Sequence, residues 1–293
     1  MTGPEIAAVG KAVEVIGQKA LGQDEKTRDE LLQAAQDTPE FKAAARTAAA
    51  RMAVKERIKL KLYQPFARMI GVSQEYFADV FPEEMAAKTA SIPDEHMVTP
   101  PASIAVPAMH GLSYSFDDPD LKEMYLNLLT AAADDRRSED AHPAFVEVIK
   151  QLSARETNLL NTVLLARETP LVRLDDRLET GGYDILLMHV MNLRDLNGEP
   201  IEDPAVPAWV DNWGRLGLVR VGYEVSLHGG NLYDWARKRP EYIRFSEGTM
   251  VRITKGYIAR TAFGERFLRA VSPPPATAAT VATISVSPQV AGD

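Results

Sequence analysis

Acidic side chains and one histidine gather in the middle of the chain, and these residue types hold divalent metal ions in hydrolases. The candidates are Asp117, Asp118, Asp120, Asp134, Asp135 and His142. A helix is predicted between the two ends of this set, and at 1.5 Å per residue it separates them by about 24 Å. A single metal site can therefore use only Asp134, Asp135 and His142. We favour helix capping and a solvated loop for these residues, with a metal-dependent hydrolase as an alternative function.

Basic side chains form two groups that could contact phosphate or another anionic partner. On a helix predicted from Thr38 to about Tyr63, three cations fall within about 60° of one another around the helix axis. These are Arg46, Arg57 and Lys61. The second group lies in residues 215–271, which hold 11 basic and 5 acidic side chains. Its members are Arg237, Lys238, Arg239, Arg244, Arg252 and Lys255. For the first group we favour a solvated helix face, with contact to an anionic partner as the alternative.

Aromatic residues are interleaved with the second basic group, which is typical of nucleic-acid contacts. They are Tyr242, Phe245 and Tyr257. The whole chain is acidic, however, with 33 basic and 41 acidic side chains, so a nucleic-acid role must depend on a local patch. The helix predicted near 208–215 carries Trp209, Asp211 and Trp213, and suits packing better than base reading. We therefore favour a protein-interaction or structural role here and keep a nucleic-acid-binding regulator as the alternative.

Composition excludes several other classes of protein. The 293 residues include no cysteine, which removes disulfides, thiolate metal sites and cysteine nucleophiles. The longest nearly apolar run, residues 185–193, is about half of a membrane span. Near the N-terminus, Glu5, Lys11 and Glu14 interrupt the region where a secretory signal needs an apolar centre. We expect a cytoplasmic protein without a transmembrane segment.

Sequence motifs of the common enzyme classes do not occur in this chain. We find no serine nucleophile elbow, glycine-rich phosphate loop, HExxH motif or dinucleotide-binding fingerprint. We therefore assign no catalytic residue, no cofactor and no metal ligand. His189, beside Leu187 and Met188, is interpreted as a packed or hydrogen-bonded side chain.

Apolar spacing and turn residues predict a series of helices followed by two strands. The predicted helices span residues 4–20, 38–63, 119–134, 143–152, 153–165, 183–193, 208–215 and 263–271, and the predicted strands span 218–225 and 250–254. A capping box, Ser153 with Glu156, begins the helix at 153. The double glycine before Tyr183 is taken as the start of the helix that follows.

These elements predict a mainly α protein whose C-terminal part is a winged-helix-like α+β unit of three helices, a small antiparallel hairpin and a final helix. The predicted organisation is an amphipathic helix and linker at 1–36, a helical domain at 37–151, the winged-helix-like domain at 152–271 and a disordered tail at 272–293. The alanine-rich segment 40–55 could seat a second copy of the chain or lie against its own fold.

Several segments resemble the abortive infection alpha family of bacterial proteins. The resemblance lies in Ile92-Pro93, in the helix with Leu121, Tyr125, Asn127, Leu128 and Leu129, in His142-Pro143-Ala144-Phe145 with Leu152-Ser153, and in the segments 214–219 and 253–271. It covers roughly residues 50–271. It implies a defence of bacteria against phage in which infected cells stop growing or die before progeny are released.

The resemblance supplies no catalytic residue, so the expected mode of action is contact with another macromolecule, either a protein partner or a phage component. Asn127 and His142 belong to the family pattern. Asn127 is expected to form a hydrogen bond across a helix pair or to face a partner or ligand site. His142, just before Pro143, is expected at the N-terminus of a helix.

Overall fold

The computed structural model describes residues 39–64, 76–178, 181–195, 197–248 and 250–273. The predicted N-terminal helix, the linker after it and almost all of the predicted tail lie outside the described residues. None of the helices in these described ranges is both long and apolar enough to cross a membrane.

The first half of the described chain is helical. Its elements are α3 (Pro39–Ile58), η1 (Lys59–Tyr63), η2 (Tyr76–Val80), α4 (Phe81–Thr89), η3 (Asp94–His96), α5 (Ala102–Ser113), α6 (Pro119–Ala132) and α7 (Ala144–Lys150). Helix α6 is the centre of this layer, since ten of its 14 residues are buried. Gly111 lets α5 approach it closely, because a Cβ atom there would lie 2.4 Å from the Tyr125 ring.

The second half combines helices with one antiparallel sheet. Its elements are α8 (Ala154–Leu165), β1 (Glu168–Arg177), β2 (Tyr183–Met191), α9 (Val206–Arg215), β3 (Val219–Gly222), η4 (Asp234–Lys238), α10 (Pro240–Ser246), β4 (Val251–Arg260) and α11 (Ala262–Val271). The strand order is β2-β1-β4-β3, and all neighbours are antiparallel. The predicted boundary between residues 151 and 152 falls between α7 and α8.

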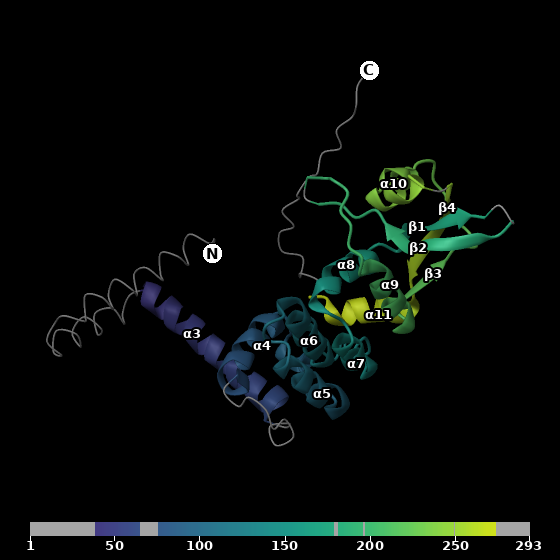
Figure 1. The fold of residues 1–293 in the computed structure, drawn as a ribbon. Helices are drawn as coiled ribbons and strands as arrows, with labels where there is room; N and C mark the ends of the chain where they lie inside the picture. The colour runs from purple at the N-terminus through teal and green to yellow at the C-terminus, as the bar shows by residue number, and fades with distance from the viewer. Residues whose placement is uncertain (1–38, 65–75, 179–180, 196, 249, 274–293) are drawn as a thin grey trace.

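The two faces of the sheet pack against different layers. Leu171 and Ile258 face the large core, which α8, α9 and α11 share with the helical half. Val172 and Leu174 face a smaller core with Tyr233 and nearby residues of η4. Figure 1 shows α10 on one side of the sheet and α8, α9 and α11 on the other.

Helix α11 joins the sheet to the helical layer. Its last residue, Val271, accepts a hydrogen bond through its carbonyl oxygen from Nδ2 of Asn127 at 2.8 Å. Oδ1 of Asn127 accepts one from Nζ of Lys88 on α4 at 2.8 Å. The expected interhelical role of Asn127 is therefore observed, with three helices connected through one buried amide.

The predicted fold class is wrong, because the protein is α+β with a four-stranded curled sheet rather than mainly α with a winged-helix unit. The segment 183–193, predicted as a helix, contains strand β2, and the double glycine before it lies at the turn of a hairpin. Strand β1 was not predicted. The predicted unit needs three helices in succession before its hairpin. In the structure, strands β1 and β2 separate α8 from α9, so only one helix lies between β2 and β3.

The other predicted elements agree closely with the structure. The helices predicted at 38–63, 119–134, 143–152, 153–165, 208–215 and 263–271 correspond to α3 with η1, α6, α7, α8, α9 and α11. The capping box is formed, since the Ser153 backbone N–H donates to Oε1 of Glu156 at 2.7 Å. Both predicted strands exist as β3 and β4, and β4 is longer than predicted.

Candidate anion-binding site

A cavity of about 630 Å³ opens where η4 and α10 meet β4 and the end of β1. Its charged lining residues are Arg177, Arg237, Arg252, Lys255 and Asp234. Four cations and one carboxylate therefore line the cavity, and one of the cations, Arg252, is also paired with the buried carboxylate of Asp175. Three of the four belong to the basic group predicted from the sequence, and Arg177 is an addition from β1.

The cavity follows the open edge of β4. Val251, Arg252 and Ile253 all border it. Because neighbouring side chains of a strand point to opposite faces, Val251, Ile253 and Lys255 share one face of β4, while Arg252 lies on the other face against Asp175 and Tyr183. Strand β3 pairs only with Tyr257–Arg260. Over the described chain, the Val251–Gly256 half of β4 has no strand beyond it, and this opening gives solvent access to the cations.

Arg252 is held at the cavity by a buried carboxylate. Its Nε lies 3.6 Å from Oδ2 of Asp175, which is fully buried on β1. Asp175 also accepts hydrogen bonds from Nε of Arg173 at 2.6 Å and from Oγ1 of Thr254 at 2.6 Å. The guanidinium carbon of Arg252 is 5.0 Å from the ring centre of Tyr183. These contacts fix the position of Arg252 while half of its side chain stays exposed.

Lys255 is positioned by an aromatic ring. Its Nζ lies 5.2 Å from the ring centre of Tyr233. The Tyr233 hydroxyl donates to the carbonyl oxygen of Gly256 at 2.8 Å and accepts from the backbone N–H of Leu227 at 3.0 Å. These two hydrogen bonds hold the hydroxyl end of the Tyr233 ring in place. Lys255, whose ammonium group lies over the ring, stays exposed.

Arg177 and Arg237 are both exposed. Neither guanidinium forms an ion pair or a hydrogen bond with any other residue of the described ranges. An unpaired arginine at a cavity is able to bind a carboxylate or phosphate through two parallel N–H groups.

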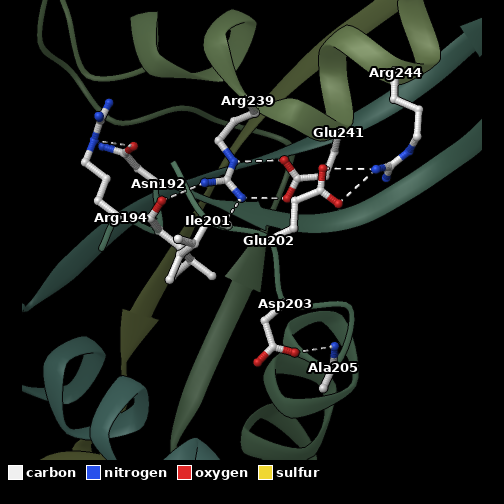
Figure 2. A network of polar contacts seen from close by, with 10 residues as sticks. Asn192, Arg194, Ile201, Glu202, Asp203, Ala205, Arg239, Glu241 and Arg244 are labelled. Atoms are coloured by element: carbon white, nitrogen blue, oxygen red, sulfur yellow. Dashed lines mark hydrogen bonds and ion pairs between the residues drawn. The ribbon is translucent and has the colours of Figure 1, made fainter. Parts of the chain in front are cut away.

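Arg239 differs from its two neighbours in sequence because it is buried. Its Nε donates to Oε2 of Glu241 at 2.9 Å, and Nη1 and Nη2 donate to the carbonyl oxygens of Leu193 and Ile201 at 2.7 and 2.6 Å. Figure 2 shows this guanidinium between Glu241 and the 192–201 segment. Arg239 therefore holds the connection between β2 and α9 against the start of α10, and it does not line the cavity.

Arg244 and Lys238 lie outside the cavity lining. Nη1 of Arg244 donates to both carboxylate oxygens of Glu202, at 3.0 and 2.8 Å (Figure 2). This bond raises the pKa of the Arg244 guanidinium, which stays charged. Lys238 is exposed. The six predicted cations of this half therefore separate into three at the cavity and three elsewhere.

The basic group on α3 and η1 is also divided. Arg57 forms an ion pair with Asp94, and Lys61 donates to the carbonyl oxygen of Met97. Both cations thus bind the segment around η3. Arg46 is exposed.

The acidic candidates do not converge. Arg136 donates to both oxygens of Asp134, at 2.8 and 2.6 Å, and these bonds hold the pKa of the Asp134 carboxyl below its usual range. Nδ1 of His96 lies 2.9 Å from Oδ1 of Asp135. Nδ1 of His142 accepts from the backbone N–H of Ala144 at 3.1 Å, at the start of α7, as expected. In the ranges that the structure describes, no three metal-ligating side chains come together.

A second polar cluster was not predicted from the sequence. His189 is buried, has a positive φ of 55°, and lies in a bulge of β2 opposite Arg173. Its backbone N–H donates to the Tyr223 hydroxyl at 3.1 Å, and its Nε2 lies 3.0 Å from Oδ1 of Asp211. Because a carboxylate only accepts, the neutral ring carries its proton on Nε2, and the tyrosine donates to Nδ1 at 3.0 Å.

Burial raises the pKa of Tyr223 to about 12, so the hydroxyl keeps its proton at neutral pH. The expected interpretation of His189 as a hydrogen-bonded side chain agrees with this arrangement. Asp211 and Tyr223 come from different elements, and no spacing in the sequence indicates that they meet. Arg177 was missed because the strand that carries it, β1, was not predicted.

The fold and the site together define an α+β protein that carries an open, basic cavity beside a four-stranded antiparallel sheet. Residues 73–271 match the sequence model of the family described as abortive infection alpha. Because this match covers more than half of the chain, the protein belongs to the abortive infection alpha family, as the resemblance predicted. No curated protein and no solved structure matches the chain.

Proposed function

We propose that this protein defends a bacterium against phage by abortive infection, and that it acts in the cytoplasm through contacts with a protein partner or a phage component. The family match carries this proposal, because it covers α4 to α11 and hence both the helical layer and the sheet with its cavity. Four cations at a solvent-open cavity offer a surface for such a contact.

Infection of a susceptible bacterium that makes the full chain tests this proposal. We expect fewer plaques and surviving cultures at a low ratio of phage to cells, and collapse of the same cultures at a high ratio. Collapse at the high ratio separates abortive infection from resistance that blocks phage entry. Growth at both ratios with plaque numbers reduced would contradict the proposal.

A second candidate function is nucleic-acid binding. It is favoured by Arg237, Arg252 and Lys255, which line one cavity. Binding through phosphate contacts weakens steeply as salt rises, with a log–log slope of about −0.7 per contact for single strands. Affinity for single-stranded DNA that does not change between low and high salt would rule out this candidate.

A further inference from the structure

We propose that the basic cavity between β4, η4 and α10 binds a nucleoside di- or triphosphate. The proposal concerns a small ligand and goes beyond the defence role, so a binding experiment can fail while the infection experiment succeeds. It uses the same cations as the nucleic-acid candidate, and the experiment below separates the two.

The charges favour a ligand with several phosphates. Arg177, Arg237, Arg252 and Lys255 line one cavity with a single lining carboxylate, Asp234, and only Arg252 of the four has a carboxylate partner, Asp175. Cations that face a common space repel one another, and an anion bound between them removes that repulsion. Several cations around one cavity can contact more than one phosphate group at once, which favours a chain of two or three phosphates.

Two of the four cations are already positioned in the free protein. Arg252 is restrained by Asp175 and by the Tyr183 ring, and Lys255 lies over Tyr233. Less conformational freedom is lost on binding when the contacting groups are held in advance. Arg177 and Arg237, which form no ion pair with other described residues, are free to close on the ligand.

The size and the apolar part of the lining favour a nucleoside over a bare polyphosphate. A volume of about 630 Å³ falls within the range of small-molecule sites, which is roughly 300–1,000 Å³. The half-buried Tyr242 and the exposed Met250 also line the cavity and provide a flat and an apolar surface for a base. The Tyr233 ring face is covered by Lys255 and is therefore not available to a base.

Titration calorimetry of the full chain at low salt, with ATP, GTP and inorganic tripolyphosphate as probes, tests the proposal. We expect ATP or GTP to bind with a Kd below about 1 mM. Arg237→Ala and Lys255→Ala should each weaken that binding by about tenfold, as expected for a lost charge-assisted phosphate contact. Lys238→Ala is the matched control, since Lys238 is adjacent and exposed but outside the lining, and its affinity should stay within about twofold.

Three results would overturn the proposal. The first is no binding of any nucleotide at about 1 mM. The second is equal affinity for tripolyphosphate and for the nucleotides, which would remove the nucleoside from the assignment. The third is much tighter binding of a single-stranded oligonucleotide that Arg237→Ala weakens, which would assign the cavity to nucleic acid. Unchanged melting temperatures of the variants show that each lost contact is local.

Discussion

The guanidinium of Arg239 and the carboxylate of Glu241 form a buried ion pair, with Nη2 and Oε1 2.6 Å apart. Only about 1% of the Arg239 side chain is exposed. The two residues before it, Arg237 and Lys238, are exposed. Three adjacent cations thus have three different environments, which are a cavity, open solvent and the interior.

Replacing Arg239 should destabilise the protein strongly. Arg239→Ala leaves Glu241 buried without its partner and removes one hydrogen bond from each of the Leu193 and Ile201 carbonyl oxygens. Loss of one partner of a buried pair costs about 3–5 kcal/mol of unfolding free energy. Lys238→Ala should change it by less than about 0.5 kcal/mol. Urea denaturation of both variants measures the difference, and equal stabilities would contradict the structural role of Arg239.

The His189 cluster predicts a second pair of stabilities. Tyr223→Phe removes the hydroxyl that accepts from the buried His189 N–H, and an unsatisfied buried donor costs about 1–3 kcal/mol. His189→Asn tolerates a positive φ, whereas His189→Val does not, because a β-branched side chain crowds the backbone there. We therefore expect Val at this position to be the less stable of the two in thermal denaturation. A His189→Val variant that is more stable than His189→Asn would contradict the positive φ of His189 in the bulge.

Asp134 predicts a dependence of stability on pH. Arg136 lowers the pKa of the Asp134 carboxyl in the folded protein relative to the unfolded chain. A lowered pKa stabilises the fold above the unfolded pKa of about 3.9, and this contribution is lost as pH falls through the folded value. Asp134→Asn should therefore reduce the unfolding free energy at neutral pH, by about 1–2 kcal/mol, and have a smaller effect near pH 3, where the unfolded carboxyl is largely protonated. A cost that is the same at both pH values would show that the charge of Asp134 is irrelevant.

Two helical glycines should respond to alanine in opposite ways. A Cβ atom at Gly264 on α11 would lie 2.0 Å from the carbonyl oxygen of Leu218, so the helix would have to move away from the chain before β3. At Gly214 on α9, no atom lies within 4 Å of the added Cβ. Gly214→Ala should raise stability by about 0.5–1 kcal/mol, and Gly264→Ala should lower it by about 1–3 kcal/mol. The denaturant midpoint should rise for Gly214→Ala and fall for Gly264→Ala relative to the unchanged protein, and a shift in the same direction for both would contradict the prediction.

Helices with regular apolar spacing or clear capping residues are predictable from the sequence, whereas α4, α5 and α10 were not predicted. Helix α9 buries Val206, Val210 and Trp213, at intervals of four and three residues. Strand β2 is not predictable in the same way. Two irregularities in its pairing with β1 shift its side chains between faces, so the apolar run from Ile185 does not alternate. A short continuous apolar run fits a helix as well as a strand.

The cavity was predictable in part. The sequence shows that Arg237, Arg252 and Lys255 belong to a basic region, but it cannot show which cations face a common space. The burial of Arg239 depends on the carbonyl oxygens of Leu193 and Ile201, which are far away in the chain. Such long-range partners leave no local pattern.

The release of phage from infected cells tests the defence role and the cavity together. Bacteria that make the wild-type chain are compared with bacteria that make Lys238→Ala or the double variant Arg237→Ala/Lys255→Ala at equal protein levels. We predict that the wild type and Lys238→Ala suppress phage release while the infected cells fail to survive, and that the double variant restores release. Infected cells that survive and resume growth while release is blocked would contradict abortive infection.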